Sequence, residues 1–143
     1  LPFGDTHLAE LPPGPLVLIA AGTGMAQMHS LIEHCRAAGF AQPVHLYWGA
    51  RTAADFYELP HWAEWQGLAN LTLHRVVSDE PGWAGRQGLL HQAVREDFAD
   101  LKVLHVYASG SPQMVYGTLD ALVEAGMDAH QMRADVFAYA PRD

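Results

Sequence analysis

The sequence predicts an α/β fold in which helices cover both faces of a five-stranded parallel sheet, forming a three-layer α/β/α domain. From Pro15 onward, short β-rich runs alternate with longer segments of helical periodicity, as in a parallel sheet with crossover helices. The first run, residues 16–20, is apolar throughout, which is typical of a strand covered on both faces. A chain of 143 residues is the usual size of one such domain.

The first strand leads into a glycine turn and then a helix. Gly22-Thr23-Gly24 follows residues 16–20 closely, and the apolar residues after it are spaced as on one face of a helix. Gly39 is expected to end this helix, because glycine readily adopts the left-handed conformation found there. The predicted buried face consists of Met25, Met28, Leu31, Ile32 and Cys35.

The remaining elements continue the alternation. Further strands are expected at residues 44–48, 71–77, 103–107 and 134–139. Helices are expected at residues 52–57, around Trp62 and Trp65, at 89–98, and from Pro112 until Gly126 closes the last one. The turn before that last helix consists of small residues, as does the turn after the first strand.

Composition excludes several classes of function. The net charge is −8 and the eight Lys and Arg residues are scattered, so we expect no nucleic-acid partner. Cys35 is the only cysteine, which excludes an internal disulfide and a cysteine-based metal site. The nine histidines are spread singly, so no metal site is predicted. No apolar run approaches the ~20 residues of a membrane span, and we expect a cytoplasmic protein.

The start of the chain indicates a domain boundary. The chain begins at Leu1 and enters at once a stretch typical of a turn, and a Pro-rich segment, residues 11–15, precedes the first strand. We therefore expect residues 1–14 to be a linker and the remnant of an upstream domain, and residues 15–143 to form the domain itself.

The turns after strands one and four are the candidate binding site. In open α/β sheets, ligands bind beyond the carboxyl ends of the strands where the strand order reverses. Glycines in the first turn allow a pyrophosphate to approach the start of the following helix. However, Gln27 stands where a third glycine would complete the dinucleotide fingerprint, which disfavours a simple dehydrogenase.

Several stretches, in order, resemble the NAD(P)-binding domain of the ferredoxin-NADP reductase superfamily. Within it, the chain is similar to reductases of bacterial oxygenases, NAD(P)H-flavin reductases and CDP-6-deoxy-glucoseen reductases. The motifs are Leu18-Ile19-Ala20-Ala21-Gly22-Thr23-Gly24-Met25-Ala26, Leu46-Tyr47-Trp48-Gly49-Ala50-Arg51, Val76-Val77-Ser78-Asp79 with Trp83-Ala84-Gly85-Arg86-Gln87-Gly88, Val106-Tyr107-Ala108-Ser109-Gly110-Ser111-Pro112-Gln113-Met114-Val115, and Asp135-Val136-Phe137.

The resemblance implies a ferredoxin-reductase-like fold and a flavin-dependent oxidoreductase that passes a hydride from NAD(P)H to FAD and on to an acceptor. The FAD would be held mainly by an upstream flavin-binding barrel domain, so this chain alone would be inactive. A ferredoxin, a [2Fe-2S] domain or an oxygenase is the candidate electron acceptor.

The resemblance also assigns residues to the site. Gly22, Thr23, Gly24 and Met25 would meet the pyrophosphate and nicotinamide. Ser109, Gly110, Ser111, Pro112 and Met114 would line the nicotinamide pocket, Ser109 beside the hydride donor, and Phe137 would lie near the flavin. The chain departs from the family pattern at three positions: Ala21 replaces a frequent glycine, Gln27 a frequent proline and Ser109 a frequent cysteine.

The preferred nucleotide depends on charge near the adenosine ribose. A carboxylate there accepts from the 2′-hydroxyl of NAD and repels the 2′-phosphate of NADP. In the family this place follows the third strand, where Ser78 and Asp79 favour NADH. Arg51 favours NADPH if it reaches the ribose, or it pairs with Asp55 one helical turn on.

A second function stays open at this point. A non-catalytic module that senses NAD(H) or another adenine nucleotide would have the same two turns. The upstream sequence distinguishes the two functions, because only the reductase requires a flavin-binding barrel.

Overall fold

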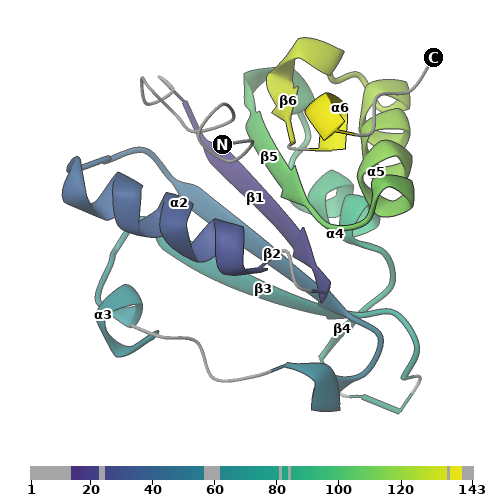
Figure 1. Cartoon of the computed structure of the whole chain (residues 1–143), viewed down its shortest axis with the longest axis horizontal. Helices are drawn as coiled ribbons and strands as arrows, with labels where there is room; N and C mark the ends of the chain where they lie inside the picture. Colours follow the sequence, from purple (N-terminus) through teal and green to yellow (C-terminus); the bar gives the residue numbers. More distant parts are fainter. Residues whose placement is uncertain are drawn as a thin grey trace.

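The computed structural model describes residues 14–22, 25–56, 62–80, 82–83, 85–134 and 136–139. The expected linker and remnant at residues 1–14 lies outside the described residues apart from Gly14, and so do Thr23 and Gly24. Within the described ranges, the predicted parallel sheet with helices on both faces is confirmed (Figure 1).

In the part of the chain that the structure describes, the sheet has six parallel strands in the order β4-β3-β2-β1-β5-β6. Their bounds are β1 Leu16–Ala21, β2 Val44–Ala50, β3 Leu71–Val77, β4 Arg86–Gln87, β5 His105–Ser109 and β6 Met132–Arg133. As expected from its apolar sequence, β1 is a central strand, and residues 16–20 have no exposed surface. Successive side chains of β1 enter two different apolar cores, one on each face of the sheet.

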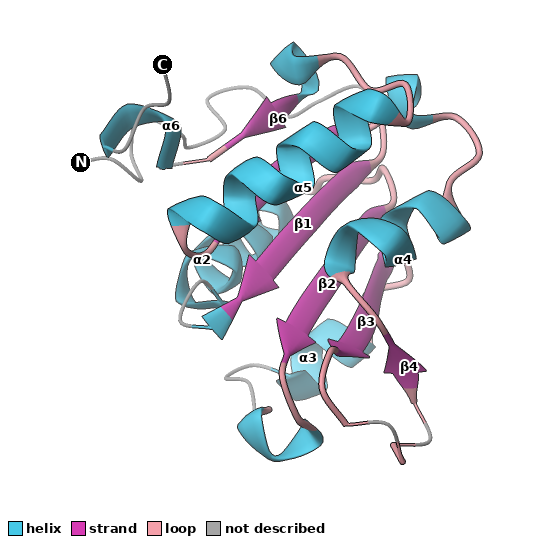
Figure 2. Ribbon diagram, turned by 90° about the vertical axis from the view of Figure 1, so that its right-hand side faces the viewer, coloured by secondary structure: helices cyan, strands magenta, loops and turns pink. Residues whose placement is uncertain are grey.

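Helices cover both faces of the sheet (Figure 2). α4 (Leu90–Asp97) and α5 (Pro112–Glu124) lie on one face, and α2 (Met25–Ala37) and α3 (Trp62–Gln66) lie on the other. Elsewhere in the described ranges, η2 (Ala53–Asp55), η3 (Leu101–Val103) and η4 (Ala129–Gln131) are 3₁₀ helices, and α6 (Val136–Tyr139) ends the described residues. Gly39 and Gly126 follow α2 and α5 with φ angles of 71° and 115°, so the predicted helix ends are confirmed.

The predicted fifth strand at residues 134–139 is wrong. The last strand is β6, where Met132 and Arg133 pair with β5, and residues 136–139 form α6. Val136 and Phe137 both pack against the core on the α4 and α5 side. Consecutive residues of a strand point to opposite faces, whereas neighbours on a helical turn can share one, which explains the helix here.

Two other strands differ from the prediction. β5 begins at His105 rather than residue 103, because Leu101–Val103 forms η3, which Asp100 caps by accepting from the Lys102 amide at 3.0 Å. β4 adds a sixth strand that the sequence did not reveal. It contains two residues, which is too short for a detectable periodicity.

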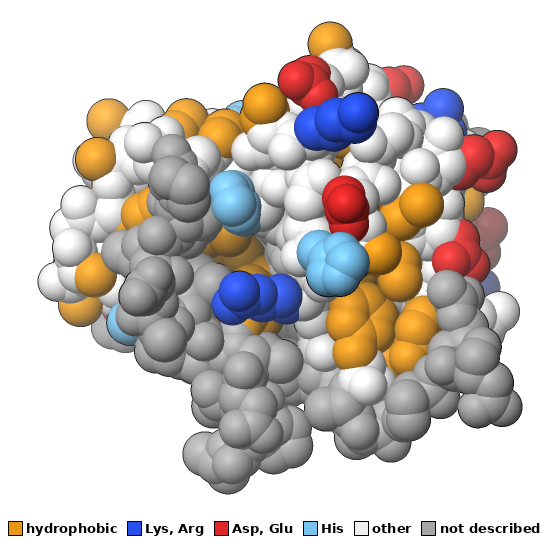
Figure 3. Space-filling model, turned by 90° about the horizontal axis from the view of Figure 1, so that it is seen from above, with side chains coloured by type: hydrophobic (Ala, Val, Ile, Leu, Met, Phe, Trp, Pro, Cys, Tyr) orange, Lys and Arg blue, Asp and Glu red, His pale blue; other side chains and the backbone are white. Residues whose placement is uncertain are grey.

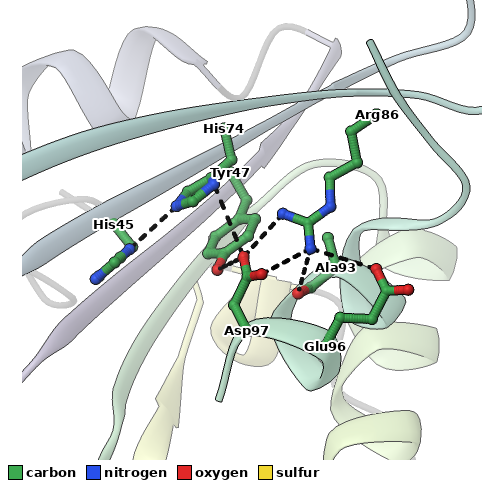
Figure 4. Close-up of polar contacts among 7 residues, drawn as sticks. All are labelled: His45, Tyr47, His74, Arg86, Ala93, Glu96 and Asp97. Carbon is green, nitrogen blue, oxygen red and sulfur yellow. Dashed lines mark hydrogen bonds and ion pairs between the residues drawn. The ribbon is translucent and has the colours of Figure 1, made fainter.

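A carboxylate at the end of α4 joins that helix to two strands (Figure 4). Asp97 accepts hydrogen bonds from both terminal nitrogens of Arg86 in β4, at 2.7 and 2.8 Å, and from the Tyr47 hydroxyl of β2 at 2.6 Å. The Arg86 guanidinium is the main reason that the pKa of Asp97 falls to about 2. Asp97 is therefore ionised at neutral pH and fixes α4 against the sheet.

Two histidines extend this network. His45 Nδ1 and His74 Nε2 lie 3.1 Å apart, and His74 Nδ1 lies 3.7 Å from Asp97 (Figure 4). Burial is the main cause that lowers the pKa of both imidazoles, which are therefore neutral at pH 7. The Asp97 carboxylate favours a proton on Nδ1 of His74, so Nε2 of His74 accepts from Nδ1–H of His45.

The Asp97→Asn variant is expected to lower the free energy of unfolding by about 2 kcal/mol, because the short hydrogen bonds to a charged group are lost and Arg86 keeps only its longer contacts with Glu96 and the Ala93 carbonyl. Urea denaturation at pH 7 measures the change. Glu124→Gln, an exposed carboxylate on α5, is the matched control and should unfold like the unchanged chain. An Asp97→Asn variant as stable as that control would show that the network does not stabilise the fold.

The fold should lose stability between pH 7.5 and pH 5.5. The unfolded chain takes up protons at histidine as the pH falls through 6.5, whereas the lowered pKa of His45 and His74 delays uptake in the folded chain. Acid therefore favours unfolding in this window. Asp97 contributes nothing to the change, because its folded pKa of about 2 lies far below it.

Urea midpoints across this range measure the effect. His74→Phe, which keeps a ring against Tyr47, should flatten the pH dependence. An unchanged slope in His74→Phe would assign the effect to other groups.

Candidate functional site

A cavity of about 810 Å³ lies at the carboxyl ends of β1, β2 and β3. Its other walls come from the beginning of α4 and the first half of α5. The strand order reverses between β1 and β5, because the chain passes from β1 to β2 on one side and reaches β5 on the other. The cavity therefore lies at the edge of the sheet where ligands of open α/β folds bind.

The turn after β1 forms one wall of the cavity. Ala21 and Gly22 line it, and Gly22 has a φ of 59°, a conformation that favours glycine. Met25, the first residue of α2, is 1% exposed and packs in the core between α2 and the sheet. Any contact between Met25 and a cofactor would therefore come from its backbone.

The turn after β5 forms a second wall. The Ser111 hydroxyl accepts from the Met114 amide at 3.2 Å and caps α5, with Pro112 in the first turn of the helix. Ser111 and Met114 both line the cavity. Gly110 allows this packing, because a Cβ at that position would lie 2.5 Å from the Met114 Cε. Ser109 is 7% exposed, and its side chain is directed to Gln27 of α2.

Arg51, Ser78 and Asp79 lie together at the rim, where the loops after β2 and β3 run side by side. The amides of Ser78 and Asp79 donate to the carbonyls of Ala50 and Arg51, at 3.0 and 2.8 Å. The Arg51 guanidinium pairs with the Asp79 carboxylate at 3.0 Å, with side chains 79% and 63% exposed. Asp55, the other partner considered for Arg51, instead accepts from Thr52.

The beginning of α4 was missed as part of the site. The sequence predicted only a helix over residues 89–98, whereas Leu89 and Leu90 both line the cavity; Leu90 is 8% exposed and Leu89 is 51% exposed. Gly88, with a φ of 122°, turns the chain into this helix. A glycine before an amphipathic helix was visible in the sequence, but the sequence did not show that this helix start faces the first turn.

His91 is the polar group of this wall. Its Nδ1 atom is buried and has no hydrogen-bond partner among the described residues. Burial is the main cause that lowers the pKa of His91, which leaves the imidazole neutral at pH 7. A neutral imidazole beside a cavity can donate one hydrogen bond to a ligand or accept one from it.

The end of β2 adds an aromatic wall. Trp48, Gly49 and Ala50 line the cavity. Gly49 is required for close packing, because a Cβ there would lie 2.7 Å from the Leu90 Cδ1. Phe137, in contrast, lies on α6 and is absent from the cavity lining; its ring centroid is 5.4 Å from that of Tyr116.

The arrangement suits an anionic ligand with flat apolar groups. α4 and α5 both begin at the cavity, so their positive dipole ends lie beside it, and most of its lining surface is apolar. Among the described residues, no three His, Cys, Asp or Glu side chains form a group that would hold a metal. On the face in Figure 3, acidic and basic side chains are interspersed, without a continuous basic stripe.

No helix in the described ranges combines the length and the apolar character needed to cross a membrane.

Comparison with known proteins identifies relatives of this arrangement. Residues 18–120 match the family described as Oxidoreductase NAD-binding domain. The chain is 33% identical to an NAD(P)H-flavin reductase of Vibrio harveyi over 96% of its own length and 60% of the relative's. It is 34% identical to a CDP-6-deoxy-L-threo-D-glycero-4-hexulose-3-dehydrase reductase of Yersinia pestis, over 86% of this chain and 38% of that one.

A solved structure agrees with these matches. The crystal structure of the Amycolatopsis cytochrome P450 reductase GcoB superposes with a TM-score of 0.78 and 32% identity, covering 88% of this chain and 40% of that one. The chain thus spans less than two thirds of the relatives described here.

Proposed function

Because this chain belongs to the family of oxidoreductase NAD-binding domains, a branch of the ferredoxin-NADP reductase superfamily, we propose that its cavity holds a nicotinamide nucleotide that donates a hydride to a flavin. The cavity at the carboxyl ends of β1 to β3 is the observation on which this proposal rests. Its volume of about 810 Å³ suits a dinucleotide held partly in the open, since ligand pockets usually measure about 300–1,000 Å³.

The residues of the cavity fit the parts of such a nucleotide. Gly22 and the positive dipole end of α5 suit the pyrophosphate, as helix beginnings do in other nucleotide sites. Trp48 and Leu90 offer apolar surface to a flat ring, and His91 offers a hydrogen bond. Thr23 and Gly24 complete the first turn in this proposal.

We place the nicotinamide beside the turn after β5. Ser109, Gly110, Ser111 and Pro112 form a turn of small residues and one proline, and Ser111 and Met114 line the cavity beside it. Ser109 takes the position beside the hydride donor, and Phe137 the position near the flavin. The task of these residues is orientation, because the redox chemistry belongs to the bound cofactors.

The intact protein is proposed to include a flavin-binding barrel before this domain. The support is that the flavin reductase of Vibrio harveyi is longer, since the chain covers 60% of it. Another relative, 30% identical, is the ferredoxin–NAD(P)+ reductase component of a naphthalene dioxygenase system in Ralstonia. We accordingly propose FAD as the flavin, a ferredoxin, [2Fe-2S] domain or oxygenase as the acceptor, and the cytoplasm as the location.

NADH is the proposed nucleotide. Asp79 engages Arg51 at the rim, so Arg51, the cation among the described residues that line the cavity, is already paired. The 2′-phosphate of NADPH would have to displace the Asp79 carboxylate from Arg51, and it would then remain close to that carboxylate, which repels it. The 2′-hydroxyl of NADH meets no such repulsion.

A large side chain at Gly117 should block the cavity. Gly117 lines it from α5, and a Cβ there would meet no atom within 4 Å, so Gly117→Phe is expected to fold normally. Calorimetry should show NADH binding weakened more than about tenfold, roughly 1.4 kcal/mol. Val123→Phe, also on α5 but exposed and away from the lining, should bind NADH normally. If Gly117→Phe bound NADH as tightly as the unchanged chain, the nucleotide would have to bind outside this cavity.

Asp79→Asn should reduce the preference for NADH. The unchanged chain is expected to bind NADH about tenfold more tightly than NADPH, and the variant about equally, because Arg51 is released and the repulsion is removed. Calorimetric titrations with both nucleotides measure the ratio, with Glu64→Gln as an exposed carboxylate control. Tighter binding of NADPH to the unchanged chain would overturn the proposed preference, and binding of neither would argue against the proposed function.

A further inference from the structure

His91 is a polar residue of the cavity wall whose ring forms no hydrogen bond with the described part of the chain. It is the second residue of α4. Leu90 before it packs against the end of β2, where Gly49 leaves room for it, and α4 lies beside α5 on the same face of the sheet (Figure 2). A ligand that fills the cavity therefore comes against this imidazole.

The two ring nitrogens of His91 differ in their surroundings. Nδ1 is buried without a partner, whereas Nε2, which also lacks a partner among the described residues, keeps exposed surface. A proton on Nδ1 would create a buried, unpaired N–H group, and such groups are rare in proteins. The beginning of a helix also carries partial positive charge, which favours a lone pair over an N–H group at the buried nitrogen. We therefore expect the proton on Nε2.

The charge on α4 favours a negatively charged partner for this N–H group. The positive dipole end of the helix lies at His91, and Arg95 follows one helical turn later. After burial, the charge of Arg95 is the second cause that lowers the pKa of His91. Because the ring is an N–H donor in positive surroundings, an anionic oxygen is the acceptor that it would bind most strongly.

The other elements around the cavity leave His91 as the group that titrates near neutral pH. Among the described lining residues, the other charged groups are Arg51 and Asp55, both after β2, and Arg51 is paired with Asp79. The polar side chains that the loop after β3 and α5 contribute do not titrate in this range; they are Ser78, Ser111, Gln113 and Thr118.

We propose that His91 binds the diphosphate of the nucleotide, with Nε2–H donating to a phosphate oxygen. This inference rests on the proposed function and adds a side chain of α4 to the contacts that the turn after β1 offers. Because the diphosphate is an anion, it stabilises the protonated ring, so binding of the nucleotide raises the pKa of His91. A ribose hydroxyl or an apolar ring in the same place would only exclude water and lower that pKa further.

Nuclear magnetic resonance tests this contact directly. The ring nitrogen shifts of His91, assigned by their absence from His91→Gln, report which nitrogen carries the proton and the pKa of the ring. Without ligand, the proton should be on Nε2 and the pKa should lie below the ordinary 6.5. Saturating NAD+, whose diphosphate stays ionised near neutral pH, should raise the proton affinity of the ring about tenfold.

Calorimetry with NAD+ at pH 7 measures the contribution to affinity. His91→Leu should bind about tenfold more weakly, because a hydrogen bond to a charged group is lost. His91→Gln places its amide N–H near the position of Nε2 and should keep most of the affinity, whereas the shorter amide of His91→Asn corresponds to Nδ1 and should not restore it.

A matched control separates the contact from general effects of losing a histidine. His130→Gln changes a histidine of η4 that is 97% exposed and outside the cavity lining, so it should bind NAD+ normally. Thermal unfolding of every variant identifies any that is merely destabilised.

The outcomes distinguish this inference from the function on which it rests. If NAD+ does not bind the unchanged chain, the proposed function fails. If NAD+ binds but the pKa of His91 stays the same or falls, the function stands and the role of His91 is overturned. A free ring with its proton on Nδ1, or a folded His91→Leu that binds NAD+ as tightly as the unchanged chain, would overturn it equally.

Discussion

The parallel pairing of β1 with β2 on one side and β5 on the other is the constraint on which the rest of the structure depends. β1 has no exposed side chain between residues 16 and 20, so it is stable only with helices on both faces. Parallel strands also end at the same edge of the sheet. The turns after β1 and β5, which are far apart in the chain, therefore meet beside one cavity.

Ionic contacts hold in place the wall of the cavity that the beginning of α4 forms. The strand β4 follows the loop after β3 and leads into α4, whose first residues line the cavity. Asp97, at the other end of α4, is fixed by Arg86 and Tyr47, and the neutral pair of His45 and His74 packs behind them. Asp97, Arg86 and Tyr47, which hold α4 in place, thus lie outside the cavity lining. The residues that stabilise this helix are therefore different from those that would contact a ligand.

The sequence was sufficient to predict the structural features that depend on residues close together in the chain. Continuous apolar runs predicted the buried strands, and Gly39 and Gly126 predicted the ends of two helices correctly. The errors concern features set by distant contacts. Residues 134–139 have a strand-like composition, but residues 136–139 form a helix, and Val136 and Phe137 both pack against one core. The two-residue strand β4, the approach of His91 to the cavity and the bond from Ser109 to Gln27 depend on tertiary packing that no local pattern encodes.

The exposure of the pair formed by Arg51 and Asp79 has a consequence for how the nucleotide is chosen. Both side chains stand in solvent, at 79% and 63% exposure, where dissolved ions screen charges separated by more than about 8 Å at physiological ionic strength and by more than about 3 Å at 1 M salt. The proposed preference for NADH, which rests on this pair, should therefore weaken as the ionic strength rises. A buried pair would be screened far less by dissolved ions than this exposed one.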